Sequence, residues 1–451
     1  MKNQLLGRVF GCFVAALSLA VIARAEVFVT GDLPRQAALG FRTGTSDEGL
    51  VVRDLATESA AAIAGLQDGD VIETINGRSF SHSYVGENRL EKLDGSELAT
   101  LNVARAGRAQ EISFTPPDKP YESIPGADSY YGVVDVADGA RLRTIITKPS
   151  GTEGPLPAIF FLQWVSCGSL EILPGGVSRS ILAKLAQESG RALIRVERST
   201  SGDSEGPACH ELDYDTELEH YREAYTELMQ SPHVDAADVV LYGSSLGSTT
   251  APLLAQQLQA DGYGVAGIVV QGGGAVTYFE RMLTFDRWYL ERRPEEVAAA
   301  DIHDELLQRV LFQSEYLIKG RSPDDIAKDS PEMAVIRADI RGLGDGHQYG
   351  RPYSWHQQAA KRNFLAAWVE IDAPVLVVFN EYDQFEGRHG HKLIVDTVNR
   401  LRPGTATYIE QPQVGHSNER YASIEDAYAG ENGKPVSDQM AELILNWLRG
   451  L

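Results

Sequence analysis

The sequence has few positive charges, few cysteines and only one long apolar run, and each shortage excludes a class of protein. Its 451 residues include 41 Lys and Arg against 63 Asp and Glu, which gives a formal net charge of −22. Nucleic acids and anionic membranes both attract basic surfaces, so neither is expected as the main partner. The three cysteines and ten histidines show no ligand spacing, so we expect no metal, and no motif points to an organic cofactor.

The apolar run opens the chain and has the features of an export signal. Lys2 and Arg8 supply positive charge, residues 9–22 are almost wholly apolar, and residues 23–25 (ARA) have the small-x-small pattern of a cleavage site. A run of about 14 residues is shorter than the ~20 needed to cross a bilayer. The sequence therefore predicts a signal peptide over residues 1–25, a mature chain from Glu26, and a periplasmic or secreted protein.

The rest of the chain divides into two units of different pattern. Residues 26–117 contain short strand-like runs, and a polar, proline-bearing linker is predicted at residues 118–127. Over residues 128–451 strands and helices alternate, which is typical of an α/β protein with a mostly parallel sheet covered on both faces. Residues 275–368 interrupt this alternation with a helical, charged and aromatic stretch, which we expect to be an insertion that caps the sheet.

The first unit contains a motif with a specific spacing. Residues 64–77 read A-G-L-x-x-G-D-x-I followed by I-N-G, and residues 38–41 are ALGF. This block resembles the bacterial PDZ domains. The resemblance implies a groove where an extended peptide adds as an extra strand, with its terminal carboxylate held by the backbone of Leu39, Gly40 and Phe41. The alternative is a PDZ-like unit that only packs against the second unit.

The second unit contains G-S-S-L-G at residues 243–247, between a strand-like run and a helix-forming run. In this context G-x-S-x-G predicts a nucleophile elbow, a sharp strand-to-helix turn that lifts one serine above the sheet. The flanking glycines permit close backbone packing, and the helix N-terminus favours negative charge. Ser245 is therefore the predicted nucleophile.

Two further residues complete a proton relay in the order that follows such an elbow. Asp383 comes after the buried strand-like run 375–379, and His416 lies in a glycine-containing loop after another strand-like run. His416 would take the proton of Ser245 and return it to the leaving group, while Asp383 fixes the imidazole tautomer. Glu381 and Glu386 are the fallback acids.

With these motifs, residues 128–451 resemble the α/β-hydrolase superfamily, nearer to the bacterial esterases and the prolyl-oligopeptidase-like branch than to lipases. Many relatives carry His-Gly after the third strand to form the oxyanion hole, whereas this chain has Gln163 before Trp164 and Val165. A backbone N–H needs no particular side chain. The resemblance therefore implies oxyanion donors at Leu246 and at Trp164 or Val165.

The same resemblance bears on Cys167 and Cys209, the two cysteines that remain once the leader is removed. They follow the third and fourth strands, which are neighbours in the superfamily's sheet. A disulfide between them is therefore expected outside the cytoplasm, with two free thiols as the alternative.

The predicted activity is hydrolysis of a carboxylic ester through an acyl-enzyme. One alternative is a serine peptidase that acts on short peptides or acyl-peptides, and another is a peptide-binding protein with an inactive hydrolase fold. The expected partners are a small ester or peptide substrate and, at the PDZ-like groove, a peptide C-terminus. Four aromatic residues of the insertion suggest either an aromatic-lined pocket or core packing: Trp288, Tyr289, Tyr353 and Trp355.

Overall fold

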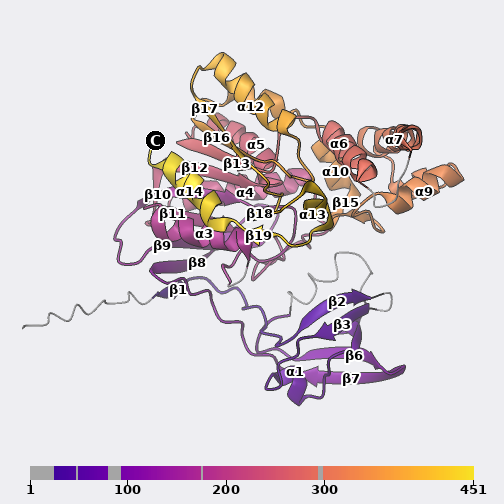
Figure 1. Ribbon diagram of the computed structural model, residues 1–451. Coiled ribbons are helices and arrows are strands. Elements are labelled where there is room, and N and C mark those ends of the chain that lie inside the picture. The colour runs from indigo at the N-terminus through magenta and orange to yellow at the C-terminus, as the bar shows by residue number, and fades with distance from the viewer. Residues whose placement is uncertain (1–24, 47–48, 80–92, 174–175, 293–297) are drawn as a thin grey trace, which may run out of the picture.

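The computed structural model describes residues 25–46, 49–79, 93–173, 176–292 and 298–451, so the predicted signal peptide, apart from Ala25, lies outside the described residues. Figure 1 shows a large body and a smaller β-rich unit beside it. None of the described helices is both long and apolar enough to cross a membrane.

A nine-stranded sheet runs through the large body in the order β1-β8-β9-β11-β10-β12-β13-β16-β17. Neighbouring strands are parallel except for β9, which runs antiparallel to both β8 and β11. The strands are β1 (Val27–Val29), β8 (Ala127–Asp135), β9 (Arg141–Pro149), β10 (Leu156–Leu162), β11 (Ala192–Val196), β12 (Val234–Ser244), β13 (Gly267–Gln271), β16 (Val375–Asn380) and β17 (Ala406–Gln411). The prediction of a mostly parallel sheet in an α/β unit is confirmed.

Helices cover both faces of this sheet because its central strands are apolar on both sides. Along β10, Phe160 belongs to one apolar core, while Phe161 belongs to a second core on the opposite face of the sheet. The first face carries α4 (Tyr214–Leu228), α5 (Gly247–Ala260), α11 (Phe364–Glu370) and α12 (Arg388–Leu401), and the second carries α3 (Val177–Glu188) and α14 (Ser437–Leu448).

A mainly helical insertion between β13 and β16 lies beside the carboxyl ends of the parallel strands (Figure 1). It comprises α6 (Tyr278–Glu291), α7 (Ala299–Gln313), the π-helix Ser314–Ile318, α8 (Pro323–Ile326), α9 (Pro331–Asp339), β14 (His347–Gln348), β15 (Arg351–Pro352) and α10 (Tyr353–Ala360). After β17 come β18 (Glu419–Arg420), α13 (Ile424–Ala429) and β19 (Lys434–Pro435).

The smaller unit is built on an antiparallel sheet with its own apolar core. Its elements are β2 (Arg42–Ser46), β3 (Gly49–Arg53), α1 (Ala60–Ile63), β4 (Val71–Ile75), β5 (Arg78–Ser79), β6 (Ala99–Arg105) and β7 (Arg108–Phe114). Ser59 caps α1 by accepting a hydrogen bond from the Ala62 amide at 3.1 Å, and Gly65 takes a left-handed conformation after it. The local turn signals of the sequence therefore produce the expected short helix and the strand after it.

The chain is anchored to the large body on both sides of the smaller unit. Before it, β1 pairs with β8 as an edge strand of the large sheet, although its residues fall within the range 26–117 predicted for the first unit. After it, Glu122, in the stretch predicted as a linker, is fully buried and bonded to Arg195 at 2.8 Å (Nη1 to Oε2). Residues 26–36 and 118–127 therefore hold the two units together.

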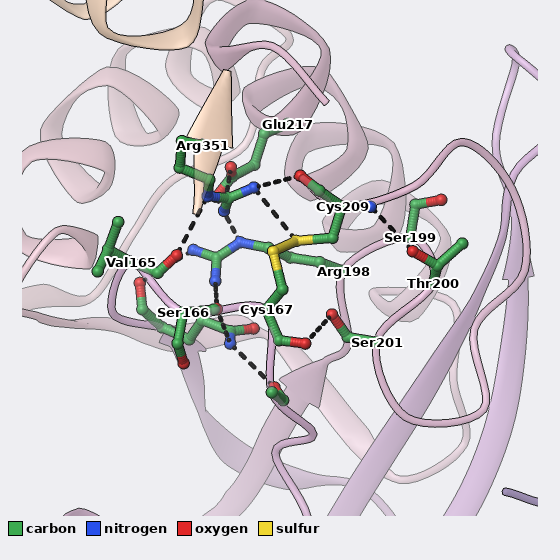
Figure 2. Close-up of a disulfide and its surroundings, with 12 residues drawn as sticks. Val165, Ser166, Cys167, Arg198, Ser199, Thr200, Ser201, Cys209, Glu217 and Arg351 are labelled. Carbon is green, nitrogen blue, oxygen red and sulfur yellow. Dashed lines mark hydrogen bonds and ion pairs between the residues drawn. A yellow bond between two sulfur atoms is a disulfide. The ribbon is translucent and has the colours of Figure 1, made fainter. Parts of the chain in front are cut away.

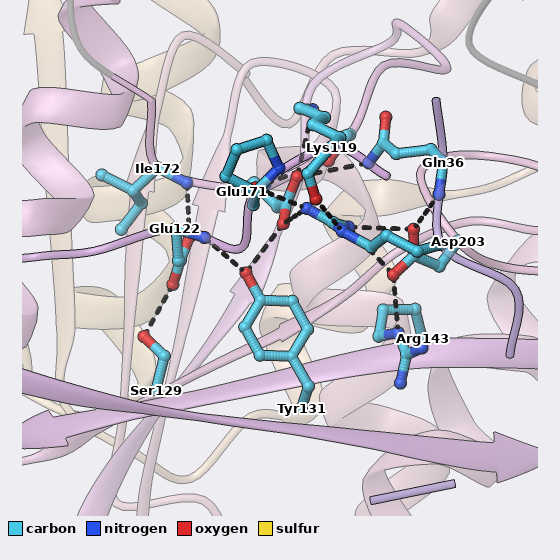
Figure 3. Close-up of polar contacts among 12 residues, drawn as sticks. Gln36, Lys119, Glu122, Ser129, Tyr131, Arg143, Glu171, Ile172 and Asp203 are labelled. Atoms are coloured by element: carbon cyan, nitrogen blue, oxygen red, sulfur yellow. Dashed lines mark hydrogen bonds and ion pairs between the residues drawn. The ribbon is translucent and has the colours of Figure 1, made fainter. Parts of the chain in front are cut away.

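A buried ionic network lies at this junction (Figure 3). The guanidinium of Arg35 donates to Asp203 at 2.9 Å and to Glu171 at 2.6 Å, and both carboxylates are almost wholly buried. Lys119 pairs with Glu171 at 3.0 Å, and the Tyr131 hydroxyl donates to the same carboxylate at 2.8 Å. Buried charges require partners of this kind, so the network ties the junction segments to two loops of the large body.

Candidate active site

The turn at residues 243–247 has the geometry of a nucleophile elbow. Strand β12 ends at Ser244, helix α5 begins at Gly247, and Ser245 between them has a φ of +53°, which is unusual for a residue other than glycine. A Cβ at Gly247 would lie 2.0 Å from the carbonyl oxygen of Leu162, and one at Gly243 would lie 2.3 Å from the carbonyl oxygen of Gly247. Only glycine fits at both positions, which explains why the motif requires them.

Three side chains from separate loops form one hydrogen-bonded chain. The Nε2 atom of His416 lies 2.8 Å from Oγ of Ser245, and its Nδ1 lies 2.8 Å from Oδ2 of Asp383. Asp383 follows β16 and His416 follows β17, and these parallel neighbours bring their loops to the same edge of the sheet. The sequence-predicted residues are thus brought together in the order that a Ser-His-Asp relay uses.

The electrostatics of the site follow from burial and from the Asp383–His416 pair. Burial disfavours the imidazolium, but the carboxylate of Asp383 and its hydrogen bond outweigh this effect and raise the pKa of His416 above 6.5. Burial also opposes ionisation of Asp383, yet His416 and the Phe385 amide lower its pKa below 3.8. Asp383 is therefore ionised at neutral pH and stabilises the protonated form of His416.

Ser245 opens onto a cavity of about 500 Å³ with mainly apolar and aromatic walls. The insertion and the loops after the strands supply these walls, including Trp164, Tyr278, Met282, Phe285, Tyr349, Trp355 and Phe385. Of the four aromatic residues singled out in the insertion, Trp355 lines the cavity, whereas Trp288, Tyr289 and Tyr353 are not among its lining residues.

The fold and this geometry agree with a match to a family model. The Alpha/beta hydrolase family model matches residues 172–426, more than half of the chain. The chain belongs to this α/β hydrolase family. No curated protein matches it.

Solved structures similar to this α/β hydrolase share little sequence with it. DcsB, solved in complex with its substrate analogue, is 18% identical with a TM-score of 0.43, and the match covers 71% of this chain and 98% of that chain. The hyperthermophilic esterase from the archaeon Pyrobaculum calidifontis is 17% identical with a TM-score of 0.40, over 71% and 85% of the two chains. EstE1, a thermostable carboxylesterase cloned from a metagenomic library, is 15% identical with a TM-score of 0.43, over 72% and 90%.

The predicted oxyanion donors of the hydrolase all line the cavity. The backbone N–H groups of Leu246, Trp164 and Val165 have no hydrogen-bond acceptor within the described parts of the chain, whereas the Ser245 amide donates to the Gln271 carbonyl at 2.7 Å. An oxyanion hole needs free, fixed donors. The amides of Leu246, Trp164 and Val165 are therefore free to donate, whereas the amide of Ser245 is already hydrogen-bonded.

Two buried arginines hold the loop that carries Trp164 and Val165 (Figure 2). Arg198 donates to the Ser166 carbonyl at 2.6 Å, and Arg351 donates to the Val165 carbonyl at 3.1 Å. Both also bind Glu217, at 2.6 and 2.7 Å. Because the arginines bind the carbonyl oxygens of this loop, they fix its backbone orientation while its amides at Trp164 and Val165 stay free.

The predicted disulfide between Cys167 and Cys209 is present beside these arginines, with a Cα–Cα distance of 5.9 Å (Figure 2). Arg351 donates to the Cys209 carbonyl at 2.9 Å, so the insertion, the disulfide and the loop that carries Trp164 and Val165 form one connected cluster. Arg351 and Glu217 are not predictable from the sequence, because neither belongs to a motif and their contact spans 134 positions.

The residues predicted to bind a peptide lie elsewhere. Leu39, Gly40 and Phe41 belong to the smaller unit, and none of them lines the cavity that contains Ser245. Gly40 has a φ of +75°, and Leu39 and Phe41 pack against that unit's core. Among the described residues, no group of three His, Cys, Asp or Glu side chains is arranged to hold a metal ion.

Proposed function

We propose that this α/β hydrolase is an exported serine esterase that cleaves a carboxylic ester through an acyl-enzyme. The observation that carries the proposal is the hydrogen-bonded chain from Ser245 through His416 to Asp383, which opens onto a largely apolar cavity. An ester suits this site because its alkoxide leaving group depends less on protonation than an amine does.

In the proposed cycle, Oγ of Ser245 attacks the ester carbonyl while Nε2 of His416 takes its proton. The amides of Leu246 and of Trp164 or Val165 stabilise the tetrahedral oxyanion. When it collapses, the bond to the alcohol breaks and His416 returns the proton to that alcohol. Water, deprotonated by His416, then attacks the acyl-enzyme. The bond between the acyl carbon and Oγ of Ser245 breaks, the acid leaves, and His416 returns the proton to Oγ.

The proposal is tested by labelling with a fluorophosphonate and by hydrolysis of p-nitrophenyl esters of increasing acyl length. We expect both to be lost in Ser245→Ala and kept in Ser244→Ala, a matched control at the neighbouring serine. Aminoacyl and dipeptidyl anilides in the same screen examine the peptidase alternative. An unlabelled wild-type chain without esterase activity would contradict the proposal and favour an inactive hydrolase fold.

Export is proposed from the leader pattern and from the disulfide, which an oxidising compartment favours. The backbone nitrogen of Glu26 lies 3.0 Å from Oδ1 of Asp128. Cleavage after Ala25 would turn this amide into an ammonium group and the contact into an ion pair. N-terminal sequencing of the secreted or periplasmic protein should begin at Glu26, and a mature chain beginning at Met1 would contradict the proposal.

For the smaller unit we propose a PDZ-like role in binding a peptide C-terminus. The support is the sequence motif together with the amides of Leu39, Gly40 and Phe41, which have no acceptor in the portion of the chain that is described. A Cβ at Gly40 would lie 2.4 Å from Cβ of Ser59, so Gly40→Ala should distort this loop. Fluorescence anisotropy should show that peptides with a free C-terminus bind the full chain, and that amidation or Gly40→Ala abolishes binding. Equal binding of free and amidated peptides would contradict this role.

A further inference from the structure

The cavity that contains Ser245 has one permanent positive charge in its wall. Arg281, on α6, lines it with a side chain that is 13% exposed, and no Asp, Glu or Lys is among the lining residues that the structure describes. The two histidines of the wall are His416 and His356, and burial lowers the pKa of His356 to about 3, so that it is neutral. This local excess of positive charge contrasts with the net charge of −22 on the whole chain.

Only part of the guanidinium of Arg281 is paired with another described residue. Its Nε forms a close ion pair with Oε1 of Glu386, a buried residue that is not among those lining the cavity. Its terminal nitrogens donate no hydrogen bond to any described residue, and Nη1 is buried without a partner. Buried donors without acceptors are rare in proteins, and they often mark a position that a ligand or water fills.

A second buried donor without a partner belongs to the same wall. The hydroxyl of Tyr349, which also lines the cavity, has no hydrogen-bond partner among the described residues. Burial raises the pKa of the Tyr349 hydroxyl, and Tyr349 lines the same cavity as Arg281. Tyr349 therefore stays protonated and can donate.

We propose that the substrate of this cavity carries a carboxylate, separate from the ester that is cleaved, and that this carboxylate accepts hydrogen bonds from Arg281 and Tyr349. The inference rests on the proposed esterase function and names its substrate class. A planar guanidinium binds a carboxylate through two parallel N–H groups, and the apolar surroundings strengthen the ion pair. The other lining side chains, including Met282, Phe285 and Phe385, suit the hydrocarbon portion between the two groups.

Glu386 competes with the substrate for Arg281. Burial raises the pKa of Glu386 to about 7, with Arg281 and His416 favouring its ionisation and Asp383 opposing it. Near neutral pH a substantial fraction of Glu386 is therefore uncharged, and the charge of Arg281 remains available to an anionic ligand. Removing this acid should strengthen binding of a substrate carboxylate, an effect that a merely structural Arg281–Glu386 pair would not produce.

The test compares substrates that differ only in this charge. Mono-p-nitrophenyl adipate and its methyl ester place the charge on the acyl side, and 4-acetoxybenzoate and its methyl ester place it on the leaving group. We expect wild-type kcat/KM to favour the charged member of one pair by about 10- to 100-fold, as hydrogen bonds to a charged group allow. Arg281→Gln and the double variant Arg281→Gln/Glu386→Gln should abolish this preference, so that each variant hydrolyses the charged and the neutral member of the pair with similar kcat/KM. Glu386→Gln alone should increase it, and Arg287→Gln, on the exposed side of α6, should leave it unchanged.

A binding measurement separates this inference from the esterase proposal. Calorimetry with monomethyl adipate should show binding to Ser245→Ala and much weaker binding to Ser245→Ala/Arg281→Gln. Equal binding to both proteins, or equal hydrolysis of charged and neutral esters by the wild-type chain, would overturn the carboxylate site. Absence of any hydrolysis, with binding that still depends on Arg281, would instead overturn the esterase proposal alone.

Discussion

The Nη2 atom of Arg351 lies 2.7 Å from Oε2 of Glu217, although Arg351 belongs to the insertion and Glu217 to helix α4 of the core. Both side chains are almost wholly buried. Burial opposes ionisation of Glu217, but the guanidinium groups of Arg198 and Arg351 outweigh it and lower its pKa. The insertion thus does more than cover the cavity, because it also holds the loop that carries Trp164 and Val165, the proposed oxyanion donors.

Arg351→Met should therefore reduce catalysis as well as stability. Removing one partner of a buried ion pair typically costs about 3–5 kcal/mol, and the freed Val165 carbonyl should loosen the loop. Loss of one oxyanion donor lowers kcat by about 10²–10³, so a partial loss should fall below that, with a smaller change in KM. Thermal unfolding and steady-state kinetics measure both effects. Arg362→Met, which breaks a more exposed ion pair with Asp215, is the control, and an equal effect there would contradict the role given to Arg351.

The pH dependence of the reaction should follow His416. His416 accepts a proton only when neutral, and its pKa lies above 6.5, so kcat/KM should be low in acid and rise as pH passes through that pKa. Asp383→Asn removes the main cause of the raised pKa, so it should move this acidic limb to lower pH and reduce kcat by about 10⁴. The control is Glu381→Gln, which alters an acid bonded to the Gln413 amide and should leave the limb in place. If the acidic limb does not move in Asp383→Asn, Asp383 is not what raises the pKa of His416.

The disulfide should contribute strongly to stability. Its cysteines are separated by 42 positions, and a chain-entropy estimate for such a loop gives about 4 kcal/mol. Cys167→Ser/Cys209→Ser should lower the melting temperature and the activity together, because the bond lies beside the loop that carries the proposed oxyanion donors Trp164 and Val165. A reductant should reproduce the loss in the wild-type chain and have no further effect on the double variant. Unchanged melting in both cases would show that the bond contributes little.

The junction between the two units should depend on Arg35. Arg35→Met leaves Glu171 and Asp203 with Lys119 and Arg143 as their remaining cations, and we expect a loss of about 3–5 kcal/mol in the free energy of unfolding. Chemical denaturation of the full chain measures it. Arg42→Met, which removes an exposed pair with Asp54, should change stability by less than about 1 kcal/mol, as is typical of surface pairs. Equal losses would mean that the buried network does not hold the junction.

The residues of the proposed triad could be predicted because each follows a strand of the parallel sheet. Runs such as β12 and β16 are recognisable from their apolar sequence, and parallel strands deliver the following loops to one edge of the sheet. The cysteine pair depended on the resemblance as well, because the superfamily's strand order is what made the strands before Cys167 and Cys209 neighbours, as β10 and β11 are.

Contacts made by single side chains over long separations were not predictable. Arg351 and Arg281 lie in an insertion whose sequence has no motif, and their partners become clear only once α4 and the loop after β16 are in place. The three residues of β1 carry no periodic signal, and their position is set by pairing with β8. Such features depend on tertiary packing, which the local sequence pattern does not predict.

The two ends of the smaller unit meet where it joins the large body. Ala37 pairs with Asp118 in a β-bridge, and the Lys119 amide donates to the Gln36 carbonyl at 2.8 Å. The smaller unit is thus inserted within the chain of the large body and is not a simple N-terminal extension of it. Joining Gln36 directly to Lys119 would remove the smaller unit and keep β1. Deleting everything from Glu26 to the end of the smaller unit would instead remove an edge strand from the sheet of the large body. The same geometry would allow the smaller unit to be replaced by another domain, with the residues around Ser245 left in place.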